Sequence, residues 1–220
     1  MKKLVIFDLD GTLLHTLPDI AENVNITLKH FGVNPLPEEI VKKHIGNGAR
    51  ELIRCCLEEE NKALVKNLDV VLEYYNKIYT NSGSEKTHLF IGVSELLVKL
   101  KEDGFYLAIL TNKPMKTTER VCEKYLKNFG FDIILGATEQ FKCKPDKEAI
   151  EYIIEKLSVK KENCFMVGDG DADAMVAVNA NVRGVSVLWG YRDKDTLEKA
   201  GGKNFVNTPE ELYKFITLAR

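Results

Sequence analysis

Seven polar residues of this 220-residue chain lie where short apolar runs end, and their types suit phosphate and metal chemistry. They are Asp8, Asp10, Thr111, Asn112, Lys144, Asp169 and Asp173. Clustered carboxylates repel one another and cost stability unless a cation lies among them. Ligand sets made only of oxygen favour a hard ion such as Mg²⁺. The lysine and the hydroxyl then need an anion on the other side of the metal, and phosphate fits.

The apolar runs predict buried strands that would bring these residues together. Leu4 to Phe7 precedes the first two acids, and similar runs cover Tyr106 to Leu110 and Cys164 to Val167. Runs with little polar alternation suit strands buried on both faces. Segments with helical apolar spacing separate them, so we expect an α/β fold with a Rossmann-like, doubly wound parallel sheet. Ligands of such sheets gather beyond the carboxyl ends of the strands.

One region between about Thr16 and Ser82 contains only helical patterns. Ile20, Val24, Leu28 and Phe31 form one apolar stripe there, and further stripes follow. The polar stretch from residue 81 to residue 84 indicates a return to the core. The sequence therefore predicts an inserted all-helical cap of about four helices over residues 16–82, with residues 1–15 and 83–220 forming the catalytic core.

Composition limits the partners of this protein. The 31 Lys and Arg nearly balance the 33 Asp and Glu, which gives a net charge of −2 without the basic stripe of a nucleic-acid-binding protein. No apolar run approaches the ~20 residues of a membrane span. Five cysteines without metal-finger spacing suit a reducing compartment. We expect a cytoplasmic protein, a monomer or weak homodimer, that binds neither nucleic acid nor membrane.

Four short motifs, in order, give the chain a specific resemblance. Asp8-Leu9-Asp10-Gly11-Thr12 resembles the DxDGT motif of the haloacid dehalogenase superfamily. Thr111, Lys144-Pro145 and the segment from Gly168 to Asp173 resemble its other three motifs. The inserted helical block is similar to the cap of the phosphoglycolate phosphatase-like branch. This resemblance covers essentially the whole chain, and it implies a Mg²⁺-dependent phosphatase acting on a small phosphorylated metabolite.

The resemblance also implies a role for each residue. Asp8 is expected to attack phosphorus and form an aspartyl phosphate, while Asp10 acts as general acid and then general base. Asp8, the backbone carbonyl of Asp10 and Asp169 are the expected metal ligands. Asp173 is expected to support the metal through water or Lys144. The expected phosphate ligands are Asp8, Thr111, Asn112 and Lys144.

Within the predicted cap, Gly46-Asn47-Gly48 reads as a turn before a helix that begins near Ala49. A helix start offers free N–H groups and a positive dipole end to an anion. Arg50 lies in this first turn. We expect this turn and Arg50 to recognise a carboxylate or second anionic group on the leaving portion of the substrate; a solvated surface arginine is the alternative.

Two other functions remain open from the sequence. A phosphosugar mutase of the β-phosphoglucomutase type resembles this chain closely, but such mutases usually carry Glu-Asp where Gly168-Asp169 stands here. A non-catalytic signalling or binding module phosphorylated on aspartate also collects acids, a Thr and a Lys on a doubly wound sheet. Such a module would be shorter and would lack the inserted helical block.

Overall fold

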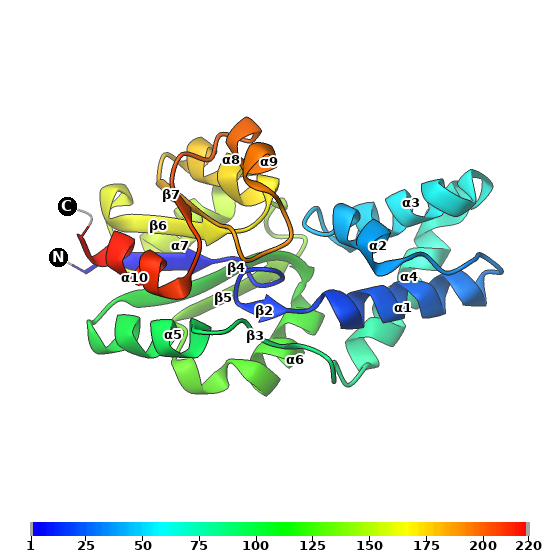
Figure 1. The fold of residues 1–220 in the computed structure, drawn as a ribbon, viewed down its shortest axis with the longest axis horizontal. Helices are drawn as coiled ribbons and strands as arrows, with labels where there is room; N and C mark the ends of the chain where they lie inside the picture. Colours follow the sequence, from blue (N-terminus) through cyan, green and yellow to red (C-terminus); the bar gives the residue numbers. More distant parts are fainter. Residues whose placement is uncertain (1, 219–220) are drawn as a thin grey trace.

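The computed structural model describes residues 2–218, and its larger sheet has six strands that all run parallel (Figure 1). The predicted Rossmann-like fold class is confirmed. In spatial order the strands are β5 (Ile133–Ala137), β4 (Tyr106–Pro114), β1 (Leu4–Phe7), β6 (Cys164–Gly168), β7 (Arg183–Val187) and β8 (Phe205–Val206).

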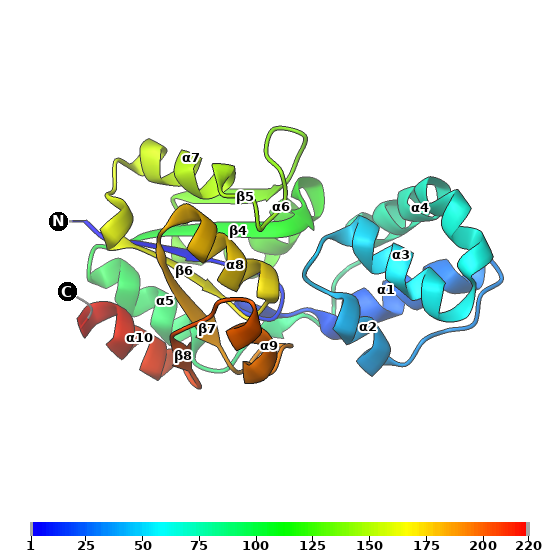
Figure 2. The ribbon, with the colours of Figure 1, turned by 90° about the horizontal axis from the view of Figure 1, so that it is seen from above.

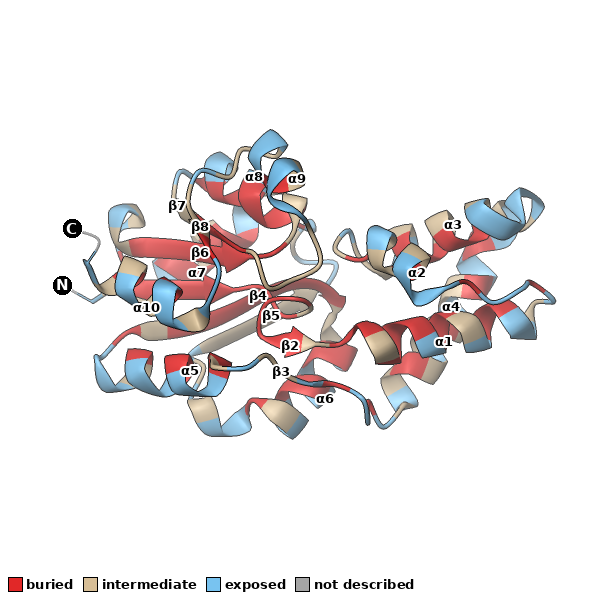
Figure 3. Ribbon diagram, in the orientation of Figure 1, coloured by how far each residue is buried: buried red, intermediate tan, exposed pale blue. Residues whose placement is uncertain are grey.

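Alternating side chains of the central strand β1 belong to two hydrophobic layers. Val5 and Phe7 pack in one cluster with α5 (Val93–Glu102) and α10 (Pro209–Leu218). Leu4 and Ile6 pack in the other with α7 (Glu148–Leu157) and α8 (Asp171–Ala180). All four strand residues are buried, so the sheet lies between two helical layers (Figure 3). The core also contains α6 (Met115–Tyr125), η2 (Lys127–Phe129), η3 (Lys161–Asn163) and α9 (Lys194–Lys199).

The helical insert follows β1 and the short strand β2 (Leu14–His15) and lies to one side of the larger sheet (Figure 2). Its buried apolar residues, all between residues 17 and 79, form a hydrophobic cluster separate from the two in the core. We infer from this that residues 16–82 form a cap. Its helices are α1 (Leu17–His30), α2 (Glu38–His44), α3 (Ala49–Glu60), η1 (Lys62–Asn67) and α4 (Leu68–Asn81). Among residues 2–218 no helix combines the length and the apolarity needed to cross a bilayer.

The two chain segments that join the core to the insert lie side by side. β2 (Leu14–His15) and β3 (His88–Leu89) form a small antiparallel sheet at the junction. The buried carboxylate of Asp19, on α1, accepts hydrogen bonds from the backbone N–H of Lys86 and from the hydroxyl of Thr87, the latter at 2.6 Å. This charged hydrogen-bonded contact ties the outgoing helix to the returning strand.

Strand β4 is longer than the apolar run that predicted it. The run ends at Leu110, but the strand continues to Pro114, with a register shift against β5 between these residues. Residues 111–113 are buried in this extension. The polar segment is therefore held by the sheet rather than by a loop, which gives its side chains fixed directions.

The Asp19 contact predicts a measurable share of stability. We expect Asp19→Ala to lower the free energy of unfolding by about 2 kcal/mol, because two donors lose a charged, buried acceptor. Urea unfolding followed by circular dichroism measures this change. Glu22→Ala is the matched control, since the ion pair of Glu22 with Lys86 is half-exposed on the same helix and is worth about 0–1 kcal/mol. Equal losses in both variants would contradict the assignment.

Candidate active site

The carboxyl ends of the central strands bring three of the predicted acids together. Asp8 follows β1 and Asp169 follows β6, and these two strands are neighbours in the sheet. The backbone N–H of Asp8 donates to the carbonyl of Val167 at 2.8 Å. One carboxylate oxygen from each of Asp8, Asp169 and Asp173 lies within 4.8 Å of the other two, and all three residues are buried.

The amine of Lys144 lies between two of these acids. It donates to Oδ1 of Asp8 and to Oδ1 of Asp173, both at 2.6 Å, and to the carbonyl of Leu110 at 3.0 Å. The backbone N–H of Lys144 donates to Oδ1 of Asn112 at 2.8 Å. Lys144 is therefore fixed at both ends, and its charge faces the carboxylate cluster.

Glycines allow the loops to approach Asp169 closely. A Cβ atom at Gly11, which has a φ of 90°, would lie 2.3 Å from Oδ2 of Asp169, and one at Gly190 would lie 2.2 Å from Cβ of Asp169. The hydroxyl of Thr12 donates to Oδ1 of Asp169 at 2.8 Å, and the backbone N–H of Tyr191 donates to Oδ2 at 2.7 Å. These contacts fix the orientation of the carboxylate.

Burial controls the protonation of the cluster. It raises the pKa of Asp8 to about 8 against the opposing effect of Lys144, and the charges of Asp173 and Asp169 add to the rise. Burial and the charge of Asp173 raise the pKa of Asp169 to about 6. Burial alone would lower the pKa of Lys144, but Asp173 and Asp8 outweigh it, so the pKa is raised and the amine stays protonated. The cluster thus holds more negative charge than its one cation balances.

The cluster has the chemistry of a divalent metal site. Its donors are all carboxylate oxygens, the ligands that hard divalent ions prefer. A cation there would replace the protons that burial otherwise favours. The carboxylate of Asp10 is not part of this cluster within residues 2–218. If Asp10 contacts a metal in this cluster, we expect the contact to come from its backbone carbonyl and not from its carboxylate.

Asp10 is paired with a lysine from the neighbouring strand. The amine of Lys113, in the extension of β4, donates to both carboxylate oxygens of Asp10, at 2.9 and 3.1 Å. It also donates to the hydroxyl of Tyr79 on α4, at 2.7 Å. The Lys113 side chain is only 3% exposed. This set of contacts connects the core to the helical insert directly beside Asp10.

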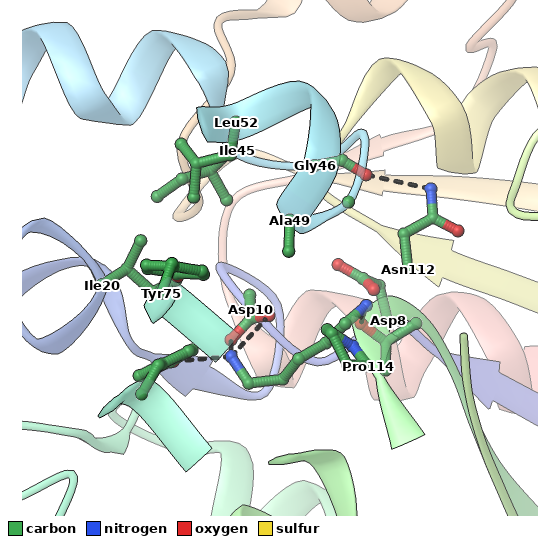
Figure 4. Close-up of a pocket in the computed structure, with 14 residues that line it drawn as sticks. Asp8, Asp10, Ile20, Ile45, Gly46, Ala49, Leu52, Tyr75, Asn112 and Pro114 are labelled. Carbon is green, nitrogen blue, oxygen red and sulfur yellow. Dashed lines mark hydrogen bonds and ion pairs between the residues drawn. The ribbon is translucent and has the colours of Figure 1, made fainter. Parts of the chain in front are cut away.

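A small cavity of ≈ 50 Å³ lies between the core and the insert (Figure 4). Its core side includes the acids Asp8 and Asp10. A cavity of this volume is large enough for a few water molecules or a small organic group. The complete lining is Asp8, Asp10, Ile20, Ile45, Gly46, Gly48, Ala49, Leu52, Tyr75, Tyr79, Thr111, Asn112, Lys113 and Pro114.

The two predicted phosphate ligands on β4 differ in what their side chains contact. Thr111 lines the cavity, and its hydroxyl oxygen accepts a bond from the backbone N–H of Lys113 at 3.2 Å. The amide of Asn112 donates to the carbonyls of Gly46 and Lys144, both at 3.0 Å. Since its oxygen accepts from Lys144 as well, the side chain of Asn112 ties a cap loop to Lys144 instead of offering donors to the cavity.

The predicted cap residues are divided between the cavity and the surface. Gly46 and Gly48 line the cavity, whereas Asn47 and Arg50 do not. The guanidinium of Arg50 donates to Asp69 at 2.7 Å, and both side chains are largely exposed. The structure therefore does not bring Arg50 to the candidate site.

Sequence reasoning missed the contacts that four residues make at the site. Thr12 and Tyr191 bind Asp169, while Lys113 binds Asp10. Tyr79 packs in the cap cluster, lines the cavity and accepts a hydrogen bond from Lys113. Position was the available signal for two of them, because Thr12 ends the first motif and Lys113 lies two residues after Thr111.

Comparisons with known proteins agree over nearly the whole chain. Residues 5–187 match the family model described as haloacid dehalogenase-like hydrolase. A phosphoglycolate phosphatase of Vibrio parahaemolyticus is 30% identical over 222 residues, which cover 99% of this chain and 97% of the relative. A phosphoglycolate phosphatase of Vibrio cholerae is 34% identical over 203 residues, which cover 90% and 89%.

Solved structures share the whole architecture. The crystal structure of a predicted phosphatase from Clostridium acetobutylicum superposes with a TM-score of 0.85 at 27% sequence identity. The superposition covers 99% of both chains, so it includes the helical insert as well as the sheet.

The carboxylate cluster predicts that a divalent cation stabilises the protein more at high pH than at low pH. The folded-state pKa values of Asp169 and Asp8 lie above their ordinary value of 3.8. In chelator, stability is therefore present at low pH and is lost as the pH rises through about 6 and about 8. Differential scanning fluorimetry at about pH 5 and about pH 8 should show this loss and its reversal by a divalent cation. A cation at 100 times its Kd adds about 2.7 kcal/mol.

Two variants test whether the cation-dependent stabilisation comes from this cluster or from other groups that titrate in the same pH range. Asp169→Asn should abolish most of the cation-dependent stabilisation. Asp171→Asn should keep it, because Asp171 lies two residues away but outside the cluster. An unchanged cation response in Asp169→Asn would exclude the cluster as the binding site.

Proposed function

We propose a substrate, a metal and residue roles for this chain, which belongs to the haloacid dehalogenase-like hydrolases and is a phosphatase of that family. It hydrolyses a phosphate monoester of a small metabolite, for which we propose phosphoglycolate. One observation carries the assignment of its nucleophile. Among the described residues, Asp8 alone belongs both to the carboxylate cluster and to the lining of the cavity. A nucleophile that must meet both metal and substrate has to occupy such a position.

Asp8 attacks the phosphorus atom of the bound ester. A bond forms between its carboxylate oxygen and phosphorus as the bond to the ester oxygen breaks, which gives an aspartyl phosphate. Asp10 donates a proton to the departing alcohol oxygen. It then takes a proton from the water that attacks the aspartyl phosphate, which releases inorganic phosphate and restores Asp8. Lys144, 2.6 Å from Asp8, balances negative charge on the phosphoryl oxygens throughout.

Thr111 and the backbone of Asn112 orient the phosphate. Thr111 lies at the cavity with a hydroxyl hydrogen free to turn toward an oxygen of the ligand. The side chain of Asn112 supports the site indirectly, because it holds the backbone of Lys144 in place.

We propose Mg²⁺ as the divalent metal, held by Asp8, the backbone carbonyl of Asp10 and Asp169. When bound, it neutralises the carboxylates and the phosphoryl oxygens so that two negatively charged partners can approach. Asp173 supports the site through Lys144, to which it is bonded at 2.6 Å. Thr12 and Tyr191 hold Asp169 in the required orientation.

Two observations favour a small-molecule phosphatase over the alternatives. The cavity of ≈ 50 Å³ beneath the cap has room for a short leaving group. A Cβ atom at Gly168 would lie 2.2 Å from the carboxylate of Asp173, so the glutamate typical of the related mutases has no room there. We retain the expectation of a cytoplasmic monomer or weak homodimer.

Phosphate release from a panel of phosphometabolites tests the activity. We expect phosphoglycolate to rank high, and Asp8→Asn to reduce turnover below about one per cent of wild type, because an amide cannot attack phosphorus. Asp10→Asn should lower kcat by about 10²–10⁴-fold. Circular dichroism should show that both variants remain folded. Substantial release by Asp8→Asn would rule out the covalent route.

The choice of metal is tested separately. Exhaustive chelation should silence phosphate release and Mg²⁺ should restore it. Ca²⁺ should compete with Mg²⁺ but support little activity, since its larger shell admits bidentate carboxylate binding that disables Asp8 as a nucleophile. Full activity after chelation, or equal activity with both ions, would contradict the proposed Mg²⁺ site.

A further inference from the structure

We propose that Lys113, together with the hydroxyl of Tyr79, binds a carboxylate on the leaving portion of the substrate. The enzyme would then select phosphate esters that carry a carboxylate close to the ester oxygen. This inference rests on the proposed phosphatase function and assigns its specificity to residues that sequence reasoning did not single out. Lys113 takes the role that the sequence analysis expected of Arg50, because Arg50 is exposed and paired with Asp69 away from the cavity.

Among residues 2–218, Lys113 is the only cationic residue in the lining of the cavity beneath the cap. The remaining lining away from Asp8 and Asp10 is mostly apolar and includes Ile20, Ile45 and Leu52. An anion that enters such surroundings loses its water and needs a compensating charge. In a poorly solvated site, an ion pair with a buried amine is stronger than one at the surface.

The position of the amine matches a carboxylate close to the ester oxygen. The Lys113 amine is 2.9 Å from Oδ1 of Asp10, and in the proposed mechanism Asp10 donates to the ester oxygen. The Lys113 amine is thus one hydrogen bond away from Asp10, which itself contacts the ester oxygen in the proposed mechanism. In an ester of a 2-hydroxy acid, the carboxylate carbon is two bonds from the ester oxygen. The carboxylate oxygens therefore lie as close to the ester oxygen as the Lys113 contact requires.

Lys113 and Tyr79 together offer two donors to one carboxylate. The hydroxyl oxygen of Tyr79 accepts from the Lys113 amine at 2.7 Å, so its own hydrogen is directed elsewhere. Burial raises the pKa of Tyr79 well above its usual value, which keeps this hydrogen in place. The ammonium group has three hydrogens, and an entering carboxylate would take over one of its two contacts with Asp10.

A matched pair of substrates tests the proposal: 2-phosphoglycolate and 2-phosphoglycolamide, which share the leaving oxygen and carbon skeleton and differ in charge. We expect the wild-type protein to prefer the carboxylate by about 10- to 100-fold in kcat/KM, the range of a charge-assisted contact. Lys113→Met should reduce this preference to nearly one. Lys113→Arg should restore part of it, and Tyr79→Phe should lower it several-fold. Arg50→Ala is the surface control and should leave it unchanged.

Each outcome separates this inference from the proposed function. No phosphate release by the wild-type protein from any ester would contradict the phosphatase function itself. Release from both substrates, with equal losses in Lys113→Met, would show that Lys113 acts only through Asp10 and would overturn the carboxylate site. A lost preference in Arg50→Ala would also overturn it. If thermal melting shows that Lys113→Met is unfolded, the preference ratios of Lys113→Arg and Tyr79→Phe decide the question.

Discussion

The confinement of three carboxylates around one buried lysine is the interaction on which the rest of this structure depends. Asp8, Asp169 and Asp173 are held within 4.8 Å of one another, and Lys144 reaches two of them at 2.6 Å. Such an arrangement is costly in a folded protein unless every charge has a partner. Much of the surrounding architecture, including the backbone ties of Lys144 and the loops at Gly11 and Gly190, holds these groups at this separation.

The same constraint explains why contacts between cap and core converge beside the acids. Asn112 links a cap carbonyl to Lys144, and Lys113 links Asp10 to Tyr79 of the cap. The guanidinium of Arg192, from the core, donates to three cap carbonyls at residues 42, 43 and 45. Asn112 and Lys113, which line the cavity, therefore also help to hold the two parts together.

Burial gives the two lysines of the site different tasks. Lys144 donates to Asp8 and Asp173 of the carboxylate cluster, and we propose that its charge serves the phosphoryl group. The amine of Lys113 contacts Asp10 and Tyr79 in the lining of the cavity, where we propose that it faces the leaving group. Lys144 contacts Asp8 and Lys113 contacts Asp10, so we propose that the phosphoryl group binds near Asp8 and a second anionic group of the substrate binds near Lys113. This arrangement is what a doubly charged small substrate requires.

Local sequence patterns were enough to predict the sheet, the acids and the lysine at its carboxyl edge, and the inserted helices. Each of these follows from local pattern: an apolar run such as Leu4 to Phe7 needs burial on both faces, and parallel neighbours align their carboxyl ends. The tertiary structure alone decided which cation faces the leaving group. Arg50 and Lys113 look equally available in the sequence, but helix α3 turns Arg50 toward Asp69 in solvent, whereas the extension of β4 buries Lys113 beside Asp10 and Tyr79. That difference arises from contacts between residues far apart in the chain: Lys113 is 34 positions from Tyr79 and 103 positions from Asp10. A local sequence pattern does not record such contacts.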